Sequence, residues 1–599
     1  MKHISIVCLL ILAFSAGAAP GEAPEAQQKA DEFLAVYNSM YQRLFTQVNE
    51  AYWVSTTDVT DTHTGQRIGA DQVYSAFQGD PAVMARAKEL LQLESRLDPL
   101  TVRQLRKILY NAAHSPGTVP DIVSGRVVAE AKQSAILDSF QFCAEKRGDS
   151  CAKVVTPNMI EGVLSTAGDL AERKKIWEVA KQSGVALKPG IVQLQQLRND
   201  VAKATGFKSF FDLEVSDYGM TVQEIMALNE KLVADLKPLY QQLHCWAKYR
   251  LAERYKQPVP KTIPAHWLGN RWGQEWPGLV EGIDMDALFK DKSPEWVVKQ
   301  AERFYVSMGM PSLPPTFWTK SDLYELPPDS ARKKNTHASA WHINLDQDVR
   351  SLMSVRSNFD WFGTTHHELG HIYYYLAYSR PEVPVTLREG ANRGFHEGIG
   401  YLIATAARQL PYLKEIGLMP ADMKVDQTQW LLDEALTNVI FMPWSSGTMT
   451  HWEHDLYEAN LPPDQYNKRW WEYVKKYQGI EPPEPRGEEY CDACTKTHIN
   501  DDPAQYYDYA ISYVIQYQIH DYIAKKILHQ DPHNCNYYGN KEVGAFLTDL
   551  LKLGATRDWR QVIKEKTGED LSTRAMVEYF KPLQVYLEQQ NKGRNITWD

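Results

Sequence analysis

Beyond Phe14, the 599-residue sequence contains no long hydrophobic run. A membrane-spanning helix needs about 18 or more apolar residues, so the rest of the chain is not predicted to insert stably into a membrane. The run from Ile4 to Phe14 is itself too short to span a bilayer. It follows a basic start and precedes small residues that suit cleavage after Ala18. We therefore predict a signal peptide over residues 1–18, and a secreted or periplasmic protein whose single domain covers residues 19–599.

Long runs of one charge, internal repeats and Gly/Ser- or Pro-rich linkers are also absent. A net charge of −10 without a basic run argues against nucleic acid as a partner. Strand signals are weak, because alternating β-branched runs and Asn-Gly or Asp-Gly turns are few. By contrast, apolar residues recur at three- and four-residue steps over residues 30–53, 220–255 and 509–528, and Thr221 suits the N-cap of the second segment. This periodicity predicts one large, mainly α-helical domain.

Cysteine is scarce, and six cysteines remain after the predicted signal peptide is removed. Cys143 and Cys151 bracket a short polar loop, "CAEKRGDSC", and we predict a disulfide between them. Cys491 and Cys494 have the spacing of half a zinc knuckle. No second pair with this spacing exists to complete four thiolates, so a local disulfide or free thiols are favoured over a zinc site.

The most informative stretch is "HHELGH", which contains His367, Glu368 and His371. In a helix, residues four apart share one face, so both imidazoles can reach one metal ion. Zinc suits two imidazoles and a carboxylate, with a fourth position open for water, and Glu368 would act on that water as a general base. The alternative is a pair of surface histidines. The apolar residues 372–376 disfavour it, because a buried histidine needs a partner.

Two glutamates compete for the third metal ligand. Glu397 lies in a second helical pattern, 30 residues after His367, which is far enough for the chain to turn back. Glu389 precedes a glycine and an asparagine, so a place in the turn is favoured for it.

A second histidine-rich stretch, "HWEHDLYE" at residues 451–458, places His451 and His454 three apart with Glu453 between them. This order matches neither zinc-helix pattern. We interpret it as a polar helix face.

Five motifs together resemble the angiotensin-converting enzyme family of zinc peptidyl-dipeptidases, in the family's order and from about residue 30 to the C-terminus. The resemblance implies a helical ellipsoid of two subdomains around a deep cleft, with one zinc ion at its floor. It also implies that His367, His371 and Glu397 bind the zinc, and that Glu368 is the general base. The motifs are "PAHWLGNRWGQEW" (264–276), "HASAW" (337–341), "HHELGH" (366–371), "LREGAN" (387–392) and "GFHEGIG" (394–400).

The segment "TKTHINDDPAQYYDYAISYVIQYQIH" resembles the family stretch that carries a lysine, a histidine and two tyrosines three apart. Alignment on its start gives Lys496 and His498, and alignment on its final helix gives Tyr506 and Tyr509. The two anchors differ by one residue, so Tyr507 remains an alternative for either tyrosine. The resemblance implies that Tyr509 and His498 donate hydrogen bonds to the oxyanion that forms when water attacks the scissile carbonyl.

The resemblance also implies which end of a peptide is bound. In the family's dipeptide-releasing branch, a glutamine, a lysine and a tyrosine hold the free carboxylate, and here these are Gln274, Lys496 and Tyr506. His337 and Ala338 are the further residues implied in substrate binding. In the carboxypeptidase branch an arginine replaces the glutamine. We therefore predict a peptidyl-dipeptidase for short peptides with a free C-terminus. The alternatives are a one-residue carboxypeptidase or a non-catalytic peptide-binding homologue.

Several family features are missing, and each has its own expected consequence. Asp508 and Val474 stand where the family has chloride-binding arginines, so chloride is not expected to be required. Tyr401 replaces an aspartate that orients a zinc-binding histidine, and a phenol accepts hydrogen bonds more weakly than a carboxylate. Two family disulfides are also missing. Thr336 and Ser354 replace both cysteines of one, and Ala524 replaces the partner of Cys535 in the other.

Overall fold

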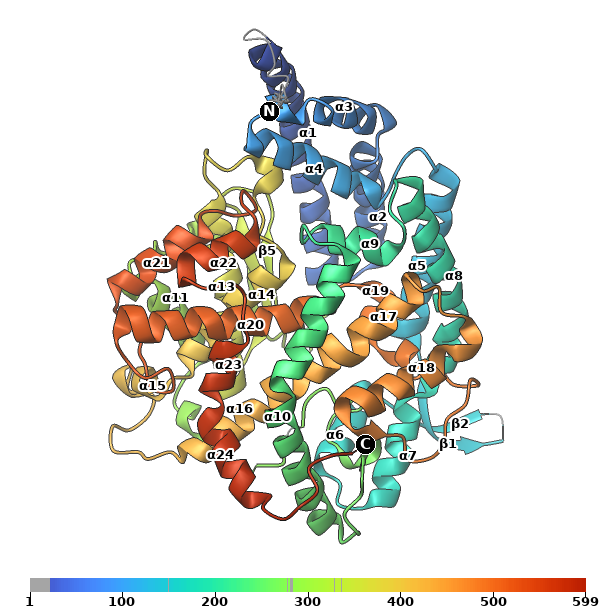
Figure 1. The fold of residues 1–599 in the computed structure, drawn as a ribbon, viewed down its shortest axis with the longest axis vertical. Coiled ribbons are helices and arrows are strands. Elements are labelled where there is room, and N and C mark those ends of the chain that lie inside the picture. Colours follow the sequence, from blue (N-terminus) through green and yellow to red (C-terminus); the bar gives the residue numbers. More distant parts are fainter. Residues whose placement is uncertain are drawn as a thin grey trace, which may run out of the picture.

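The computed structural model describes residues 22–148, 150–276, 278–280, 284–327, 329–335 and 337–598. The predicted signal peptide and Thr336 lie outside these described residues. Helices dominate the molecule, so the prediction of a mainly α fold is confirmed (Figure 1). No helix in the described ranges combines the length and the apolar character that crossing a bilayer demands.

The first helices form a small layer at one end of the molecule, around the N-terminus (Figure 1). They share an apolar cluster that includes Leu34, Leu90 and Leu105, separate from the main core. The predicted helix at 30–53 lies within α1. The helices of this layer are α1 (Glu22–Thr57), α2 (Asp61–Gln78), α3 (Pro81–Leu91) and α4 (Pro99–Ala113).

The next helices lead toward the long helix α10, whose start was predicted correctly. Thr221 accepts a hydrogen bond from the Glu224 amide, while the Glu224 side chain accepts one from the Thr221 amide. This reciprocal capping satisfies amides that the first helical turn leaves unpaired. These helices are α5 (Pro120–Ser139), α6 (Pro157–Thr166), α7 (Leu170–Ala180), α8 (Gln182–Ala204), α9 (Phe210–Ser216) and α10 (Val222–Tyr255).

Within the described ranges, strands are short and occur in three small sheets. A hairpin of β1 (Phe142–Arg147) and β2 (Ser150–Val155) is closed by the predicted Cys143–Cys151 disulfide. The second sheet pairs β3 (Ile263–Pro264) with β7 (Ile480–Glu481). The third has the order β4-β6-β5, which leaves β5 at an edge. Its strands are β4 (Asp322–Tyr324), β5 (Ser339–His342) and β6 (Val349–Val355).

The centre of the molecule is formed by α13, α14 and α20, with α14 packed against the other two. Around them lies the main apolar core, whose members are drawn from the sequence between Ala113 and Trp598. The remaining helices are α11 (Pro294–Ser307), α12 (Pro315–Lys320), α13 (Phe359–Tyr378), α14 (Arg393–Ala407), α15 (Leu410–Glu415), α16 (Gln427–Met442), α17 (Thr450–Tyr457), α18 (Tyr466–Tyr473), α19 (Thr497–Asp501), α20 (Tyr507–Tyr522), α21 (Lys541–Leu551), α22 (Trp559–Thr567), α23 (Arg574–Tyr579) and α24 (Lys581–Gln590).

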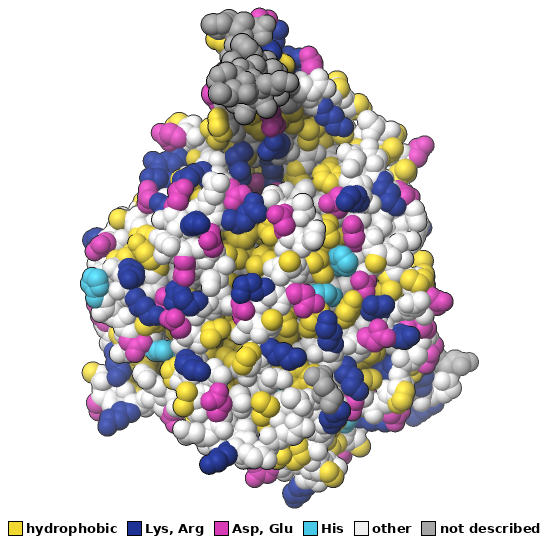
Figure 2. Space-filling view, viewed as in Figure 1, with side chains coloured by type: hydrophobic (Ala, Val, Ile, Leu, Met, Phe, Trp, Pro, Cys, Tyr) yellow, Lys and Arg dark blue, Asp and Glu magenta, His cyan; other side chains and the backbone are white. Residues whose placement is uncertain are grey.

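The visible surface mixes charges of both signs. Figure 2 shows basic and acidic side chains interspersed over one face, with apolar side chains between them. This distribution agrees with a sequence that has no long run of one charge.

Candidate metal and peptide site

Helix α13 carries the two histidines and the glutamate of the central motif. Its N-cap is Asn358, whose side chain accepts a hydrogen bond from the Trp361 amide at 2.8 Å. Most of its central apolar side chains, such as Phe362 and Ile372, are fully buried. The prediction of a buried helix is therefore confirmed, and the polar groups on it must find partners inside the protein.

Helix α14 crosses α13 at a pair of glycines. A β-carbon on Gly370 would lie 3.2 Å from the Gly400 α-carbon, so the two backbones approach closely only because both residues lack side chains. A β-carbon on Gly400 would lie 2.6 Å from the His367 ring. The absence of a side chain at Gly400 thus provides the space that the His367 imidazole occupies.

This crossing gathers three candidate metal ligands. The Nε2 atoms of His367 and His371 lie 3.0 Å apart, and a Glu397 carboxylate oxygen lies 3.6 Å from the His367 Nε2 atom. Ligand atoms of all three residues lie within 4.8 Å of one another. Glu389 is not in this group, because it forms an ion pair with Lys107 at 2.7 Å.

The chemistry of these donors fits zinc. Burial lowers the pKa of His367 to about 3 and that of His371 to about 4, so both imidazoles are neutral and can donate lone pairs. Two imidazoles and one carboxylate form a donor set that leaves a fourth tetrahedral position open.

Glu368 lies on the same helix and is 7% exposed. Burial, followed by the negative charge of Glu397, raises the pKa of its carboxyl group to about 8. A carboxyl group that titrates near neutral pH is suited to both taking and returning a proton.

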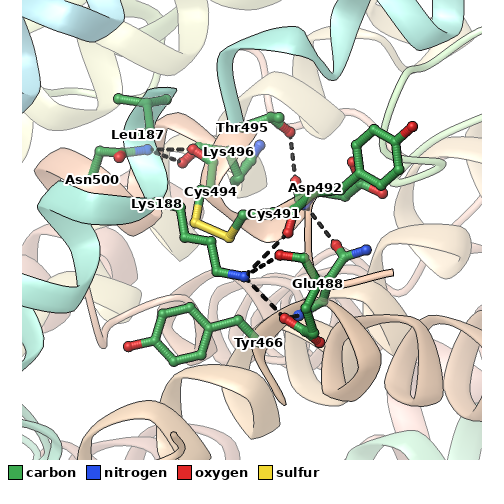
Figure 3. Close-up of a disulfide and its surroundings, with 12 residues drawn as sticks. Leu187, Lys188, Tyr466, Glu488, Cys491, Asp492, Cys494, Thr495, Lys496 and Asn500 are labelled. Atoms are coloured by element: carbon green, nitrogen blue, oxygen red, sulfur yellow. Dashed lines mark hydrogen bonds and ion pairs between the residues drawn. A yellow bond between two sulfur atoms is a disulfide. The ribbon is translucent and has the colours of Figure 1, made fainter. Parts of the chain in front are cut away.

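A second group of side chains lies around Lys496. The Lys496 ammonium donates a hydrogen bond to the Gln274 side-chain oxygen at 2.7 Å and lies 5.4 Å from the centre of the Tyr506 ring. The structure thus brings together all three residues that the family resemblance assigns to carboxylate binding. Lys496 follows a disulfide between Cys491 and Cys494, so of the local disulfide and the free thiols that the sequence left open, the structure shows the disulfide (Figure 3).

His498 and Tyr509 form a third group. The Tyr509 hydroxyl lies 3.3 Å from the His498 Nε2 atom, and the Tyr506 ring packs against both residues. Tyr507 points elsewhere, because it is buried against Phe211 and Tyr218. Of the alternatives left by the sequence, the structure therefore places Tyr506 and Tyr509 beside His498.

The edge strand β5 follows His337 and Ala338 and lies beside α13. The Tyr375 hydroxyl on α13 donates a hydrogen bond to the Ala340 carbonyl at 3.3 Å. His337 is exposed, and its charge is among those that lower the pKa of His498. The segment that contains His337 therefore lies close to both α13 and His498.

Comparison with known proteins decides the family. A family model described as angiotensin-converting enzyme matches residues 24–598. The chain belongs to the angiotensin-converting enzyme family.

Individual members of the angiotensin-converting enzyme family agree with this assignment. The enzyme of Theromyzon tessulatum is 30% identical, with 96% of this chain and 94% of that protein covered. The enzymes of Bos taurus and Rattus norvegicus are also 30% identical, and each covers 98% of this chain. This chain spans about half the length of those two relatives, at 46% and 45%.

His396 is a residue that the sequence analysis missed, although it lies within the quoted family motif "GFHEGIG". Its Nδ1 atom lies 2.7 Å from the Nδ1 atom of His371, and its buried Nε2 atom has no hydrogen-bond partner among the described residues. Tyr401 instead packs its ring against His367, with 4.8 Å between ring centres. No hydrogen bond joins this phenol to His367 in the described structure, so Tyr401 contacts this imidazole through ring packing.

Arg393 is a second missed residue, and it lies at the N-terminus of α14. Its guanidinium donates a hydrogen bond to the Tyr509 hydroxyl at 3.2 Å and lies 3.5 Å from the Asp508 carboxylate. Tyr218 donates a hydrogen bond to the same carboxylate at 2.5 Å. Asp508 is thus buried between a cation and a hydroxyl donor. Asp508 stands where the family has a chloride-binding arginine, and here its partner is the internal cation of Arg393.

The interpretation of "HWEHDLYE" as a polar helix face is wrong. Glu453 is 1% exposed and accepts a hydrogen bond from the Ala504 amide, while His451 is buried and lies 3.0 Å from Glu230. The pattern is misleading because these polar groups are paired inside the protein rather than solvated.

Proposed function

We propose that this protein is a zinc metallopeptidase that releases dipeptides from the free C-terminus of short peptides. The observation that carries the proposal is the hydrogen bond from Lys496 to Gln274 beside Tyr506. A buried ammonium with neutral donors around it is suited to a carboxylate. The distance from this group to the metal ligands would set the length of the released product.

The residues divide the chemistry among them. His367, His371 and Glu397 would hold zinc, which supplies Lewis-acid chemistry by polarising a carbonyl and lowering the pKa of water. Glu368 accepts the proton of the attacking water at its carboxylate and passes it to the leaving amine.

The developing oxyanion needs hydrogen-bond donors. The Tyr509 hydroxyl and the His498 imidazole are the candidates, because their polar atoms lie 3.3 Å apart and both rings pack against Tyr506. His337 and Ala338, next to the edge strand β5, would bind the extended peptide backbone.

We also retain the predictions on cell location. Residues 1–18 are proposed to be a signal peptide and residues 19–599 a single exported domain. Two disulfides support an oxidising compartment.

The direct test is product analysis of a tripeptide with a blocked N-terminus, by mass spectrometry with and without a metal chelator. We expect an intact C-terminal dipeptide, and no product with the chelator. Release of single amino acids alone would instead indicate the carboxypeptidase alternative.

A matched control is Glu368→Ala. The variant should keep its zinc content while kcat falls by at least about a hundredfold, because only the proton carrier is removed. Unchanged activity would assign the base to another group. A protein that binds peptides but releases no product even with bound zinc would be the non-catalytic homologue.

A further inference from the structure

The disulfide between Cys491 and Cys494 lies next to the carboxylate-binding group. Both cysteines are fully buried, and Lys496 follows the second of them after a single residue. The bond closes a short loop, with a sequence separation of 3 between the two cysteines (Figure 3). The chain immediately before Lys496 is therefore covalently restrained.

Two helices anchor the first half of this loop. A β-carbon on Gly184, in the first turn of α8, would lie 2.1 Å from the Cys491 carbonyl oxygen, so the loop is packed closely against α8. From α18, the Trp471 indole donates a hydrogen bond to the Asp492 carboxylate at 2.8 Å. The disulfide carries this anchorage across to the end of the loop that precedes Lys496.

The Lys496 ammonium needs a restrained backbone because its surroundings do not favour a charge. The residue is 4% exposed, and its ammonium lies 4.4 Å from the centre of the Trp272 ring and 5.8 Å from that of Trp444. Burial, followed by the charge of Arg271, lowers the pKa of Lys496 to about 7. Because water solvates an ammonium better than this site does, a loop with more freedom would let the side chain adopt other orientations.

We propose that the Cys491–Cys494 disulfide positions the Lys496 ammonium to bind the C-terminal carboxylate of the substrate. This inference rests on the proposed function. The disulfide is a positioning element, because it acts through Lys496. A cation that is already oriented binds a carboxylate more tightly, since less conformational freedom is lost on binding. Breaking the disulfide should therefore weaken substrate binding more than it slows the chemical step.

The stability that a disulfide gives to the whole fold is a separate effect, and loop length distinguishes the two. A disulfide that closes a longer loop restricts the unfolded chain more and is expected to stabilise the fold more. Cys143 and Cys151, in the hairpin of β1 and β2, have a sequence separation of 8, against 3 for Cys491 and Cys494. If global stability alone mattered, loss of the hairpin disulfide should disturb substrate binding at least as much.

The test is the double variant Cys491→Ala/Cys494→Ala, assayed on a tripeptide with a blocked N-terminus and a free C-terminal carboxylate. We expect KM to rise by about tenfold or more while kcat stays within about threefold, because Lys496 binds the carboxylate and transfers no proton. The same tripeptide with a C-terminal amide lacks the charge that attracts Lys496, so its KM should change by less than about twofold. An unchanged KM for the free carboxylate, or equal rises for both peptides, overturns the proposal.

The matched control is Cys143→Ala/Cys151→Ala, which removes the hairpin disulfide instead. Its Tm should fall, while KM for both peptides stays within about twofold of the unmodified protein. Equal rises of KM in the two double variants would mean that lost stability is responsible, and would also overturn the proposal. If Cys491→Ala/Cys494→Ala does not fold, Cys491→Ser breaks the same bond with a smaller change in volume, and its KM values decide in the same way.

Calorimetry separates this inference from the proposed function. If the peptides release dipeptides and KM does not respond to loss of the disulfide, the function stands and the inference fails. If neither peptide is cleaved, binding of the dipeptide Ala-Ala and of its C-terminal amide still decides the inference. Weaker binding of the free dipeptide in the variant, with unchanged binding of the amide, supports it. Equal affinity of both proteins for the free dipeptide, or no preference of the unmodified protein for the free carboxylate, contradicts it.

Discussion

The Asp508 carboxylate illustrates how one residue can change the expected response to anions. It is buried, accepts a hydrogen bond from Tyr218, and lies beside the Arg393 guanidinium. Arg393 in turn donates to Tyr509 and forms an ion pair with Asp502 at 2.6 Å, so internal carboxylates stabilise the cation that orients this hydroxyl. A mobile chloride ion has no free partner in this arrangement.

We therefore predict little chloride dependence for the unmodified protein. Titration of chloride into a chloride-free assay should change kcat/KM by less than about twofold, because the cation is already paired. In Asp508→Ala, activity should fall by about tenfold or more and recover partly with chloride, since Tyr218 then lacks its acceptor and Arg393 keeps only Asp502 as a carboxylate partner. Strong activation of the unmodified protein would refute this.

Single residues also mark where reasoning from the sequence ended. His367 and His371 could be predicted because helical spacing alone places them on one face, and Glu368 because it directly follows the first histidine of the motif. Arg393 could not, since its role depends on a contact with another element, namely Tyr509 on α20. No spacing within one helix signals such a contact.

At the scale of elements, the crossing of α13 and α14 holds the candidate metal site together. Gly370 and Gly400 bring the backbones close, and the His367 ring fills the space beside Gly400. The position of Glu397 relative to the histidines follows from this crossing. A side chain at the crossing would separate the donors.

We predict that Gly400→Ala weakens zinc binding by about tenfold or more, because the added methyl group would lie 2.6 Å from the His367 ring. The same overpacking should destabilise the fold by about 1–3 kcal/mol. Competition with a chromophoric chelator measures the first effect, and denaturant unfolding measures the second.

Gly162→Ala is the matched control for this variant. Gly162 lies inside α6, and a β-carbon there would meet nothing within 4 Å. The control should keep full zinc affinity and gain about 0.4–1 kcal/mol of stability. Equal zinc affinity in both variants would contradict the proposed role of the crossing.

The helices themselves followed their sequence signals to different degrees. The long periodic segments became α1, α10 and α20, and the Thr221 cap formed as expected. The periodicity did not reveal that α20 is followed by a π-helical turn over Ile523–Leu528. The helical pattern of α17 also suggested solvent-exposed polar groups, whereas Glu453 and His451 are buried. Burial of a polar residue depends on its tertiary partners, which periodicity does not contain.

For the whole molecule, metal binding should contribute to stability. The candidate ligands belong to two helices at the centre of the main core, so zinc would join elements that unfolding separates. Free zinc at about 1,000 times its Kd would add about 4 kcal/mol. Chelation should therefore lower Tm measurably in a calorimetric scan.

His371→Gln supplies the control for this prediction. The variant should show a low Tm that no longer responds to the chelator, because the donor set is incomplete. A chelator effect of equal size in this variant would mean that the stabilising metal lies at another site.

The sequence by itself determined the helical class, the zinc-binding motif, the Cys143–Cys151 disulfide and membership of the family through its ordered motifs. Each of these depends on residues close in sequence or on a pattern repeated along one element. The tertiary structure alone decided between Tyr506 and Tyr507 beside His498 and gave Asp508 its cation. These outcomes required the packing of separate helices, because burial and charge pairing arise only when distant segments meet.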